Sequence, residues 1–416
     1  MAVSWLSGNE IYCLDKINLT PGNLLVGNSV HSMGIIRSLG SSIKAVVGGE
    51  VRAFTELIED GRRTAYAKMV TELKSHGGYG VTWVSSEIIF HGGNIEFLSI
   101  GSAIHSKTEG PIEDGKPHFS SSSNAQELYA QVDAWYKPLG FVFGNVAYSI
   151  GIAKWIIGTF RSLRRGEVKE FSWIFNKTRN LALERIVADA SKVNANAVIW
   201  IETTILPIGV SGVQEMLMIG TAAYNEHIPK IAGNEIVTSD LTAQEMWGLT
   251  NMGYAPMRLV LGTSVYSLWF IWGITSFFKS FVKWEIPELT KMIYDAREES
   301  LWIIQREAQE LWADDVVGVK TYVYELGGGL IEFLAIGTAI KKIPWVKTKT
   351  DALLTQAIVS DKDTFVNSFD DAVWVSLNQT WRETSWNFNK KWAGIVGGFF
   401  ILLYLILGII WAFTGK

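Results

Sequence analysis

The chain has 416 residues and a formal net charge of −4. This length predicts two to four domains, and the lack of a basic surplus disfavours duplex nucleic acid as a partner. Cys13 is the single cysteine, which excludes a disulfide within the chain. Because Met1 to Glu10 combine neither a basic nor an apolar region, we expect no cleaved signal peptide.

The first predicted elements are a short helix and a strand. Ser7 and Glu10 have the spacing of a capping box. In this motif the Ser side chain accepts from the backbone N–H of the Glu, and the Glu side chain accepts from the backbone N–H of the Ser. The apolar run 24–26 predicts a strand that ends at Gly27. A leader helix followed by a strand is therefore expected at the start of the chain.

A long helix and a hairpin are predicted next. Apolar residues recur at helical spacing over 50–76, and a glycine pair ends the pattern. The β-rich runs 81–90 and 95–104 are separated by a glycine-containing turn, which predicts a hairpin. The unit is thus β-α-β-β, with one helix across a small antiparallel sheet whose poorly covered edges favour lateral association.

This unit occurs three times. Residues 27–32 recur as 144–149 and 262–267, and residues 96–103 recur as 215–222 and 332–339. The leader pairs Asn124/Glu127 and Thr242/Glu245 occupy the places of Ser7 and Glu10. We predict an α+β chain of three tandem copies. Copy one spans 1–105, copy two 106–224 and copy three 225–341, followed by a juxtamembrane linker or interfacial helix over 342–391.

Five motifs of copy one are distinctive: Gly27-Asn-Ser-Val, Val46-Val-Gly-Gly49, Arg62, Gly80-Val81 and Leu98-Ser-Ile-Gly-Ser-Ala103. Together they resemble the bacterial YbjQ-like domain, a family also labelled heavy-metal-binding. The pattern is similar in all three copies, but copies two and three replace the Gly-Gly pair by Arg165-Gly166 and Lys283-Trp284. The resemblance implies a dodecin-like fold, assembly into pentameric rings and no established enzymatic activity.

The metal label has weak support in the residues. No two histidines are spaced i,i+3 or i,i+4, and no CxxC is present. His31 corresponds to Tyr148 and Tyr266 in the other copies, whereas a metal ligand should keep its residue type in every copy. We therefore expect no metal site and no cofactor.

Charged residues that persist through the copies are the candidate sites. Arg62, Arg179 and Arg297 correspond to one another, as do Glu96, Glu215 and Glu332. An ion pair within or between subunits is the favoured interpretation, and a ring of arginines that binds an anion is the alternative.

Glu50, Glu167 and Glu285 are expected to begin the long helices, where a carboxylate offsets the helix dipole. Gly101, Gly220 and Gly337 indicate a bulge or a close backbone approach. Since no catalytic triad, phosphate loop or dinucleotide fingerprint is visible, we expect no enzyme.

Two long apolar runs remain. Residues 259–278 begin with the first strand of copy three, so we do not interpret them as a membrane span. Trp269, Phe270 and Trp272 in this run are instead expected at the bilayer interface or in a subunit contact.

Residues 392–413 carry no charge and are long enough for a transmembrane helix across a hydrocarbon core of about 30 Å. Trp392 and Trp411 lie near its ends, where interfacial aromatic belts form, and Gly394 and Gly398 could let two such helices pack closely. Basic residues precede the run, which predicts cytoplasmic N-terminal domains, a single pass through the cell (inner) membrane and an outer C-terminus.

These features predict a membrane-anchored structural scaffold. Five chains would form three stacked rings on the cytoplasmic face, with one copy of each chain at each level. The expected partners are the chain itself and the lipid bilayer; no protein partner is indicated. The alternative is a binder of a small molecule or ion in the lumen of the rings, with a pore as an extension.

Overall fold

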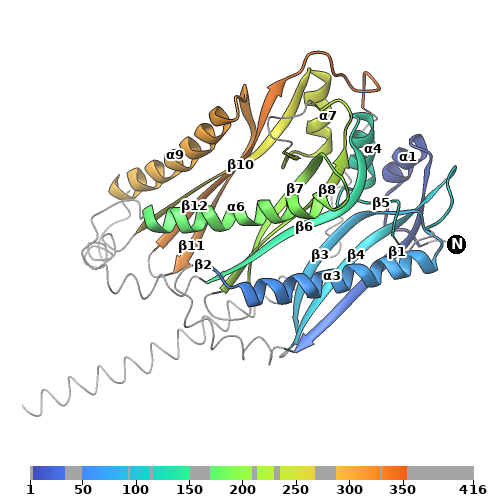
Figure 1. Ribbon diagram of the computed structural model, residues 1–416, viewed down its shortest axis with the longest axis horizontal. Coiled ribbons are helices and arrows are strands. Elements are labelled where there is room, and N and C mark those ends of the chain that lie inside the picture. Colours follow the sequence, from blue (N-terminus) through green and yellow to red (C-terminus); the bar gives the residue numbers. More distant parts are fainter. Residues whose placement is uncertain are drawn as a thin grey trace, which may run out of the picture. The chain divides into compact units, whose positions relative to one another are not determined.

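Three repeats of one element order make up the described part of the chain (Figure 1). The computed structural model describes residues 3–32, 49–91, 94–112, 116–149, 169–208, 213–228, 235–267, 287–327 and 330–353. Copy one contains α1 (Gly8–Lys16), β1 (Leu19–Ser32), α3 (Arg52–Ser75), β3 (Gly80–His91) and β4 (Asn94–Ser106). Copy two contains α4 (Ala125–Asp133), β6 (Lys137–Ser149), α6 (Lys169–Ser191), β7 (Ala197–Pro207) and β8 (Val213–Tyr224). Copy three contains α7 (Ala243–Asn251), β10 (Tyr254–Ser267), α9 (Pro287–Glu310), β11 (Asp315–Gly327) and β12 (Leu330–Lys342).

The order leader helix, strand, long helix and hairpin confirms the predicted α+β fold with three β-rich repeats. In every copy the last strand lies between the other two and pairs with both in antiparallel fashion. Short strands extend two of the sheets. β5 (Phe119–Ser120) and β9 (Val237–Thr238) run parallel to β3 and β7, while β2 (Gly49–Glu50) of copy one joins the edge of β6 in copy two. Neighbouring copies therefore share a sheet edge.

The first strand is longer than the sequence predicts. β1 continues through Gly27 as far as Ser32, so the expected strand end at Gly27 is wrong. A Cβ at Gly27 would overlap the carbonyl oxygen of Ala65 and the amide nitrogen of Met69 in α3. The glycine is needed inside the strand because the helix backbone crosses it there. Gly144 and Gly262 meet α6 and α9 in the same way.

Left-handed backbone conformations recur at three equivalent places in the copies. The position before the first strand, the turn after the long helix and the bulge in the second strand of each copy (β3, β7 and β11) all have positive φ. Before the first strand these residues are Asn18, Trp135 and Gly253. After the long helix they are Gly77, Asn194 and Trp312, and at the bulge they are Trp83, Trp200 and Gly318. Each place holds a glycine in one copy and a tryptophan in another. The shared backbone geometry thus overrides the steric cost of the side chain.

The predicted membrane features fall outside this description. Among the described residues, no helix is both long and apolar enough to cross a membrane. The apolar run 392–413 with Trp392, Gly394, Gly398 and Trp411 lies outside the described residues. So do Trp269, Phe270 and Trp272.

Candidate functional site

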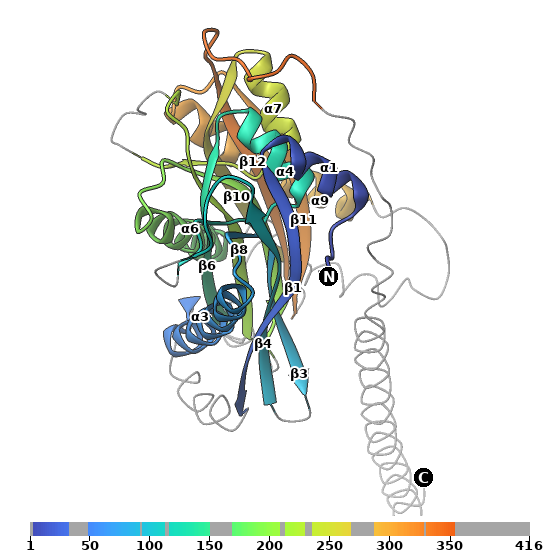
Figure 2. The same cartoon turned by 90° about the vertical axis from the view of Figure 1, so that its right-hand side faces the viewer.

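The most extensive candidate site is the lateral contact that each long helix makes with the next copy. Figure 2 shows α3 and α6 on the same side of the sheets, with the leader helices α1, α4 and α7 gathered away from them. In copy one, Phe54 and Ile58 of α3 pack with Ala147 of β6 and with Val213 of β8. In copy two, Phe175 of α6 packs in one core with residues of β10 and β12 from copy three. Each of these helices thus packs against the sheet of its own copy and against the sheet of the following copy. The second contact buries the apolar face of that following sheet.

A buried ion pair lies in the first of these contacts. Arg62 of α3 donates from Nε to Glu215 Oε1 at 3.2 Å and from Nη2 to Oε2 at 2.7 Å. Its Nη1 donates to the carbonyl oxygen of Ser86 at 2.8 Å. Both side chains of the pair are 0% exposed. The guanidinium therefore holds a carboxylate of the next copy through the paired geometry that only arginine offers.

The second contact repeats this pair. Arg179 of α6 donates to both carboxylate oxygens of Glu332, with the shortest distance at 2.8 Å, and both side chains are again fully buried. Burial opposes the positive charge, yet the pKa of Arg179 lies above its ordinary value because Glu332 and Tyr148 more than offset the burial. The arginine of one copy consequently binds the glutamate of the following copy, rather than the glutamate of its own hairpin.

Hydroxyl groups support the same junctions. Thr55 accepts a hydrogen bond from the N–H of Ala147 at 3.0 Å, and Ser172 accepts one from the N–H of Val265 at 2.9 Å. These acceptors satisfy backbone N–H groups of β6 and β10 that would otherwise be buried without a partner. The sequence analysis did not single out Thr55 or Ser172, although they occupy equivalent positions in α3 and α6.

Glu50 does not cap the long helix, contrary to the expectation. α3 begins after Val51, which has no side-chain cap, and Glu50 belongs to β2. Its carboxylate instead accepts from Arg185 Nη2 of copy two at 2.6 Å. Pairing with the neighbouring sheet therefore decides this residue's conformation. The counterparts Glu167 and Glu285 lie outside the described residues.

Glycines inside the last strands allow a close approach between strands. A Cβ at Gly101 would stand 2.5 Å from Val81 Cγ1, and one at Gly337 would stand 2.8 Å from Val316 Cγ1. At Gly220 the corresponding distance to Val198 Cγ1 is 3.0 Å. The register shift itself lies on the facing strand, between Thr82 and Ser85 in copy one. Each of these glycines is therefore the single residue opposite a bulge in the facing strand, where the two strands also come close.

Arg297 and Glu96 are not brought together within the chain. Arg297 on α9 is exposed, whereas its counterparts Arg62 and Arg179 are 1% and 0% exposed. Glu96 on β4 accepts hydrogen bonds from Asn28 at 2.9 Å and from His91 at 2.6 Å. Those bonds lower the pKa of Glu96 despite some burial. Glu96 is the first of the three equivalent glutamates, and Arg297 is the last of the three equivalent arginines. The other members of these two series form the two internal pairs.

The expectation of three stacked rings is corrected by these contacts. In stacked rings each level holds the same copy from every chain. Copy two would then contact the second copies of neighbouring chains, through its helix face on one side and its sheet face on the other. In the described part of the molecule, copy one covers the sheet face and copy three takes the helix face. The copies of one chain therefore lie side by side.

The leader helices form a second row of contacts. Ser7 and Thr242 make the predicted capping boxes with Glu10 and Glu245. Asn124 accepts from the N–H of Glu127, but the Glu127 carboxylate does not return the contact. It instead accepts from the N–H groups of Ala243 and Gln244 at the start of α7. Burial raises the pKa of Glu127 to about 7, although these two N–H groups oppose the rise.

We expect Glu127 to make stability depend on pH. Its pKa is about 7 in the folded chain, against an ordinary value of 4.5. The folded state therefore binds the proton more tightly, so the contribution of Glu127 to stability is fully present below about pH 4.5 and is lost as the pH rises through about 7. The loss should be about 3 kcal/mol. Chemical denaturation between pH 4 and 8 gives the free energy of unfolding of the native chain and of Glu127→Gln. The difference between the two should change across this range by the amount that is lost.

Replacement of an exposed carboxylate on α6, Glu184→Gln, is the matched control. It should leave the pH profile of the native chain unchanged. A constant difference between Glu127→Gln and the native chain over this range would contradict the assignment.

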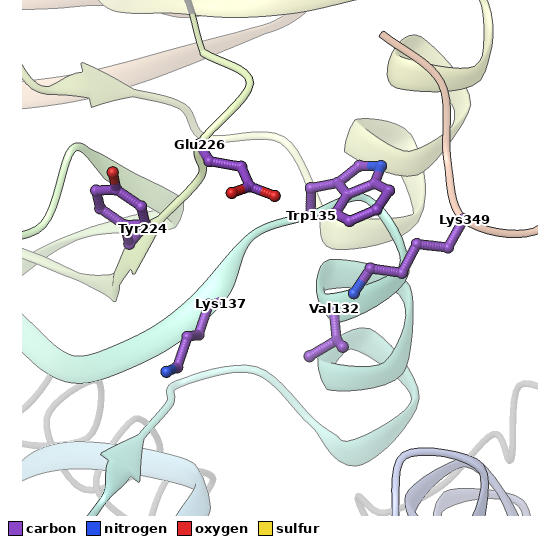
Figure 3. A pocket seen from close by; sticks show the side chains of 6 residues that line it. All are labelled: Val132, Trp135, Lys137, Tyr224, Glu226 and Lys349. Carbon is purple, nitrogen blue, oxygen red and sulfur yellow. The ribbon is translucent and has the colours of Figure 1, made fainter.

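A cleft of about 420 Å³ lies where copy two begins (Figure 3). Val132, Trp135 and Lys137 line it from the end of α4 and the start of β6, with Tyr224 and Glu226 opposite. Lys349 reaches in from the segment after copy three, with its Nζ 4.7 Å from the centre of the Trp135 ring. The indole N–H of Trp135 donates to the carbonyl oxygen of Lys347 at 2.7 Å. These contacts fasten the segment after copy three onto copy two.

The described residues do not fit a heavy-metal site. Among them, no three His, Cys, Asp or Glu side chains stand close enough to hold a metal ion. Cys13, the softest donor in the chain, is buried in α1. A soft metal requires thiolate or imidazole ligands that converge on one point, and the described side chains do not provide that arrangement.

Comparison with known proteins agrees with the repeat. A family model described as "Putative heavy-metal-binding" (YbjQ_1) matches residues 18–106, 132–226 and 248–342. The chain belongs to the YbjQ family. The three matches confirm the predicted tandem copies, and each match begins in the second half of the leader helix of its copy or just after it.

Two kinds of relative were found. A UPF0145 protein of Thermotoga petrophila is 40% identical over 90 residues, which is 22% of this chain and 84% of the relative. A UPF0145 protein of Methanococcus maripaludis is 40% identical over 85 residues, or 20% of this chain and 76% of the relative. An encapsulin nanocompartment protein of Mycobacterium tuberculosis is 26% identical over 241 residues, which is 56% of this chain and 88% of the relative. That match is longer than any single YbjQ domain of this chain.

Proposed function

We propose that the chain is a membrane-anchored scaffold without catalytic activity, which assembles through the lateral faces of its YbjQ domains. The observation that carries the proposal is the helix-to-sheet contact with its buried arginine–glutamate pair, which occurs twice in one chain. An interface that is built repeatedly from equivalent residues extends readily to further copies. Similarity to an encapsulin nanocompartment protein supports a role in assembly.

The membrane part of the proposal rests on the sequence together with the direction of the strands. β1, β6 and β10 end at Ser32, Ser149 and Ser267, each opposite the hairpin of its own copy. The described part of each of these strands thus ends at the hairpin end of its sheet, and Trp269, Phe270 and Trp272 follow Ser267 closely in the sequence. We propose that this end faces the bilayer, that residues 342–391 lead from the opposite end of the copy-three sheet to an anchor at 392–413, and that the YbjQ domains are cytoplasmic.

The arrangement of the copies bears on the number of chains in an assembly. Five chains followed from pentameric rings with one copy of each chain at each level, and side-by-side copies remove the second of these premises. A closed ring now contains a whole number of chains, and hence a multiple of three YbjQ domains. The mass of the full chain in mild detergent determines this number.

Membrane anchoring is tested with two substitutions in the apolar run. Leu403→Arg together with Ile406→Arg places two charges near its centre, at about 2.5–3.5 kcal/mol each on insertion scales. The native chain should stay in the membrane fraction after an alkaline wash, and this variant should be released. Leu403→Ala together with Ile406→Ala keeps the run apolar and is the control. Release of the native chain by the wash would overturn the anchor.

A further inference from the structure

The sheet face of copy one carries an apolar patch that the other two copies bury. Leu24, Val26 and Val30 of β1 are 39%, 46% and 58% exposed. Their counterparts in β6 are Phe141, Phe143 and Ala147, at 8%, 4% and 0%. Those in β10 are Leu259, Leu261 and Val265, at 1%, 0% and 0%. Copy one thus presents the surface that receives a long helix in copies two and three.

Glu96 belongs to this patch. It pairs with Val30 across β1 and β4, just as Glu215 pairs with Ala147 and Glu332 with Val265. Directly opposed residues of an antiparallel pair project from the same face of the sheet. The carboxylate of Glu96 therefore stands beside the exposed apolar residues, where Glu215 and Glu332 each bind an arginine.

The opposite end of the chain presents the complementary helix face. Arg297 of α9 is exposed, while its counterparts Arg62 and Arg179 are buried in the following copy. Ile293 and Leu301 are its neighbours one turn away on either side, and they are partly exposed. Their counterparts pack across the internal junctions: Phe175 with copy three, and the ring of Tyr66 5.7 Å from that of Phe141.

We propose that a second copy of this chain binds head to tail, with α9 of one chain on the β1–β4 face of the next and Arg297 paired with Glu96. The contact continues the two internal junctions and uses the same residue types at the same positions. It is heterologous, so it generates a ring when the rotation closes and a filament when it does not. This inference rests on the proposed scaffold function and specifies the surface through which that scaffold grows.

Charge reversal tests the contact with the full chain in mild detergent. Arg297→Glu alone opposes two carboxylates, and Glu96→Arg alone opposes two guanidinium groups. Each should weaken association between chains at least tenfold, as measured by mass against concentration. The double variant, with Arg297→Glu and Glu96→Arg in one chain, restores opposite charges at every contact, whatever the number of chains in the assembly. We expect it to recover the mass of the native assembly.

Arg306→Glu is the matched control, since its counterparts Thr71 and Ala188 are exposed in the packed helices. It reverses a charge on the same helix outside the predicted contact and should leave the mass unchanged.

Cross-linking separates this contact from association through the anchor. Chains with Arg297→Cys and chains with Glu96→Cys are mixed and treated with a short bis-maleimide, while the native Cys13 is buried. We expect a linked pair of unlike chains, and none when Arg306→Cys replaces Arg297→Cys. Native mass in both reversal variants, or no linked pair above that control, would overturn the head-to-tail contact but not the scaffold. A native chain that stays monomeric at all concentrations would overturn both.

Discussion

Replacement of Glu332 by glutamine should lower the free energy of unfolding by about 3–5 kcal/mol. Arg179 would then stay buried between copies two and three without a carboxylate, and the guanidinium cannot shed its proton to escape the cost. Urea denaturation at constant protein concentration measures the loss. The expected mechanism is an uncompensated buried charge, not the removal of an attractive contact of that size.

The double variant Arg179→Met with Glu332→Leu distinguishes these two mechanisms. Removal of both charges should recover most of the lost stability, because apolar side chains of similar volume often replace a buried pair at little cost. Glu56→Gln is the surface control: it breaks the ion pair with Arg52, whose side chain is 81% exposed, and should cost less than about 1 kcal/mol. A Glu332→Gln variant as stable as this control would contradict a buried pair at the junction.

Replacement of Gly144 by alanine should cost about 3 kcal/mol or more. A Cβ at this position would overlap the carbonyl oxygen of Ala182 and the amide nitrogen of Ile186. Both are backbone atoms of α6, so no side chain can rotate away, and the helix must shift from both sheets that it contacts. Thermal and chemical denaturation should show the loss.

Gly248→Ala is the matched control for this prediction. Gly248 lies within α7, and a Cβ there would meet nothing within 4 Å. Alanine should therefore stabilise the chain by about 0.5–1 kcal/mol, through better helix propensity and a less flexible unfolded state. If Gly144→Ala behaved like Gly248→Ala, the close crossing of strand and helix would be refuted.

The elements of each copy were predictable because their signals are local. Helical spacing, a glycine stop and a glycine-containing hairpin turn act within a few residues, so α3 and the β3–β4 hairpin follow from the sequence almost to their ends. The end of β1 was not predictable in this way. Gly27 has the local character of a strand terminator, and its actual reason is the crossing of α3, which is distant in sequence.

The candidate site was only half predictable for the same reason. Persistence through three copies singled out the arginines and glutamates, but it could not say which copy each arginine contacts. Glu50 illustrates the same limit, since its position favours a helix cap and the neighbouring strand β6 draws it into a sheet instead.

By itself, the sequence determined the three YbjQ copies, their β-α-β-β order and the residue types that recur in them. These properties depend on periodicity and repetition, which are visible in one dimension. The tertiary structure decided that the copies lie side by side, that each buried arginine holds the glutamate of the following copy, and that Arg297 and Glu96 are left at the two ends. Partner choice among equivalent residues depends on how the long helices pack between sheets, and no local pattern encodes that packing.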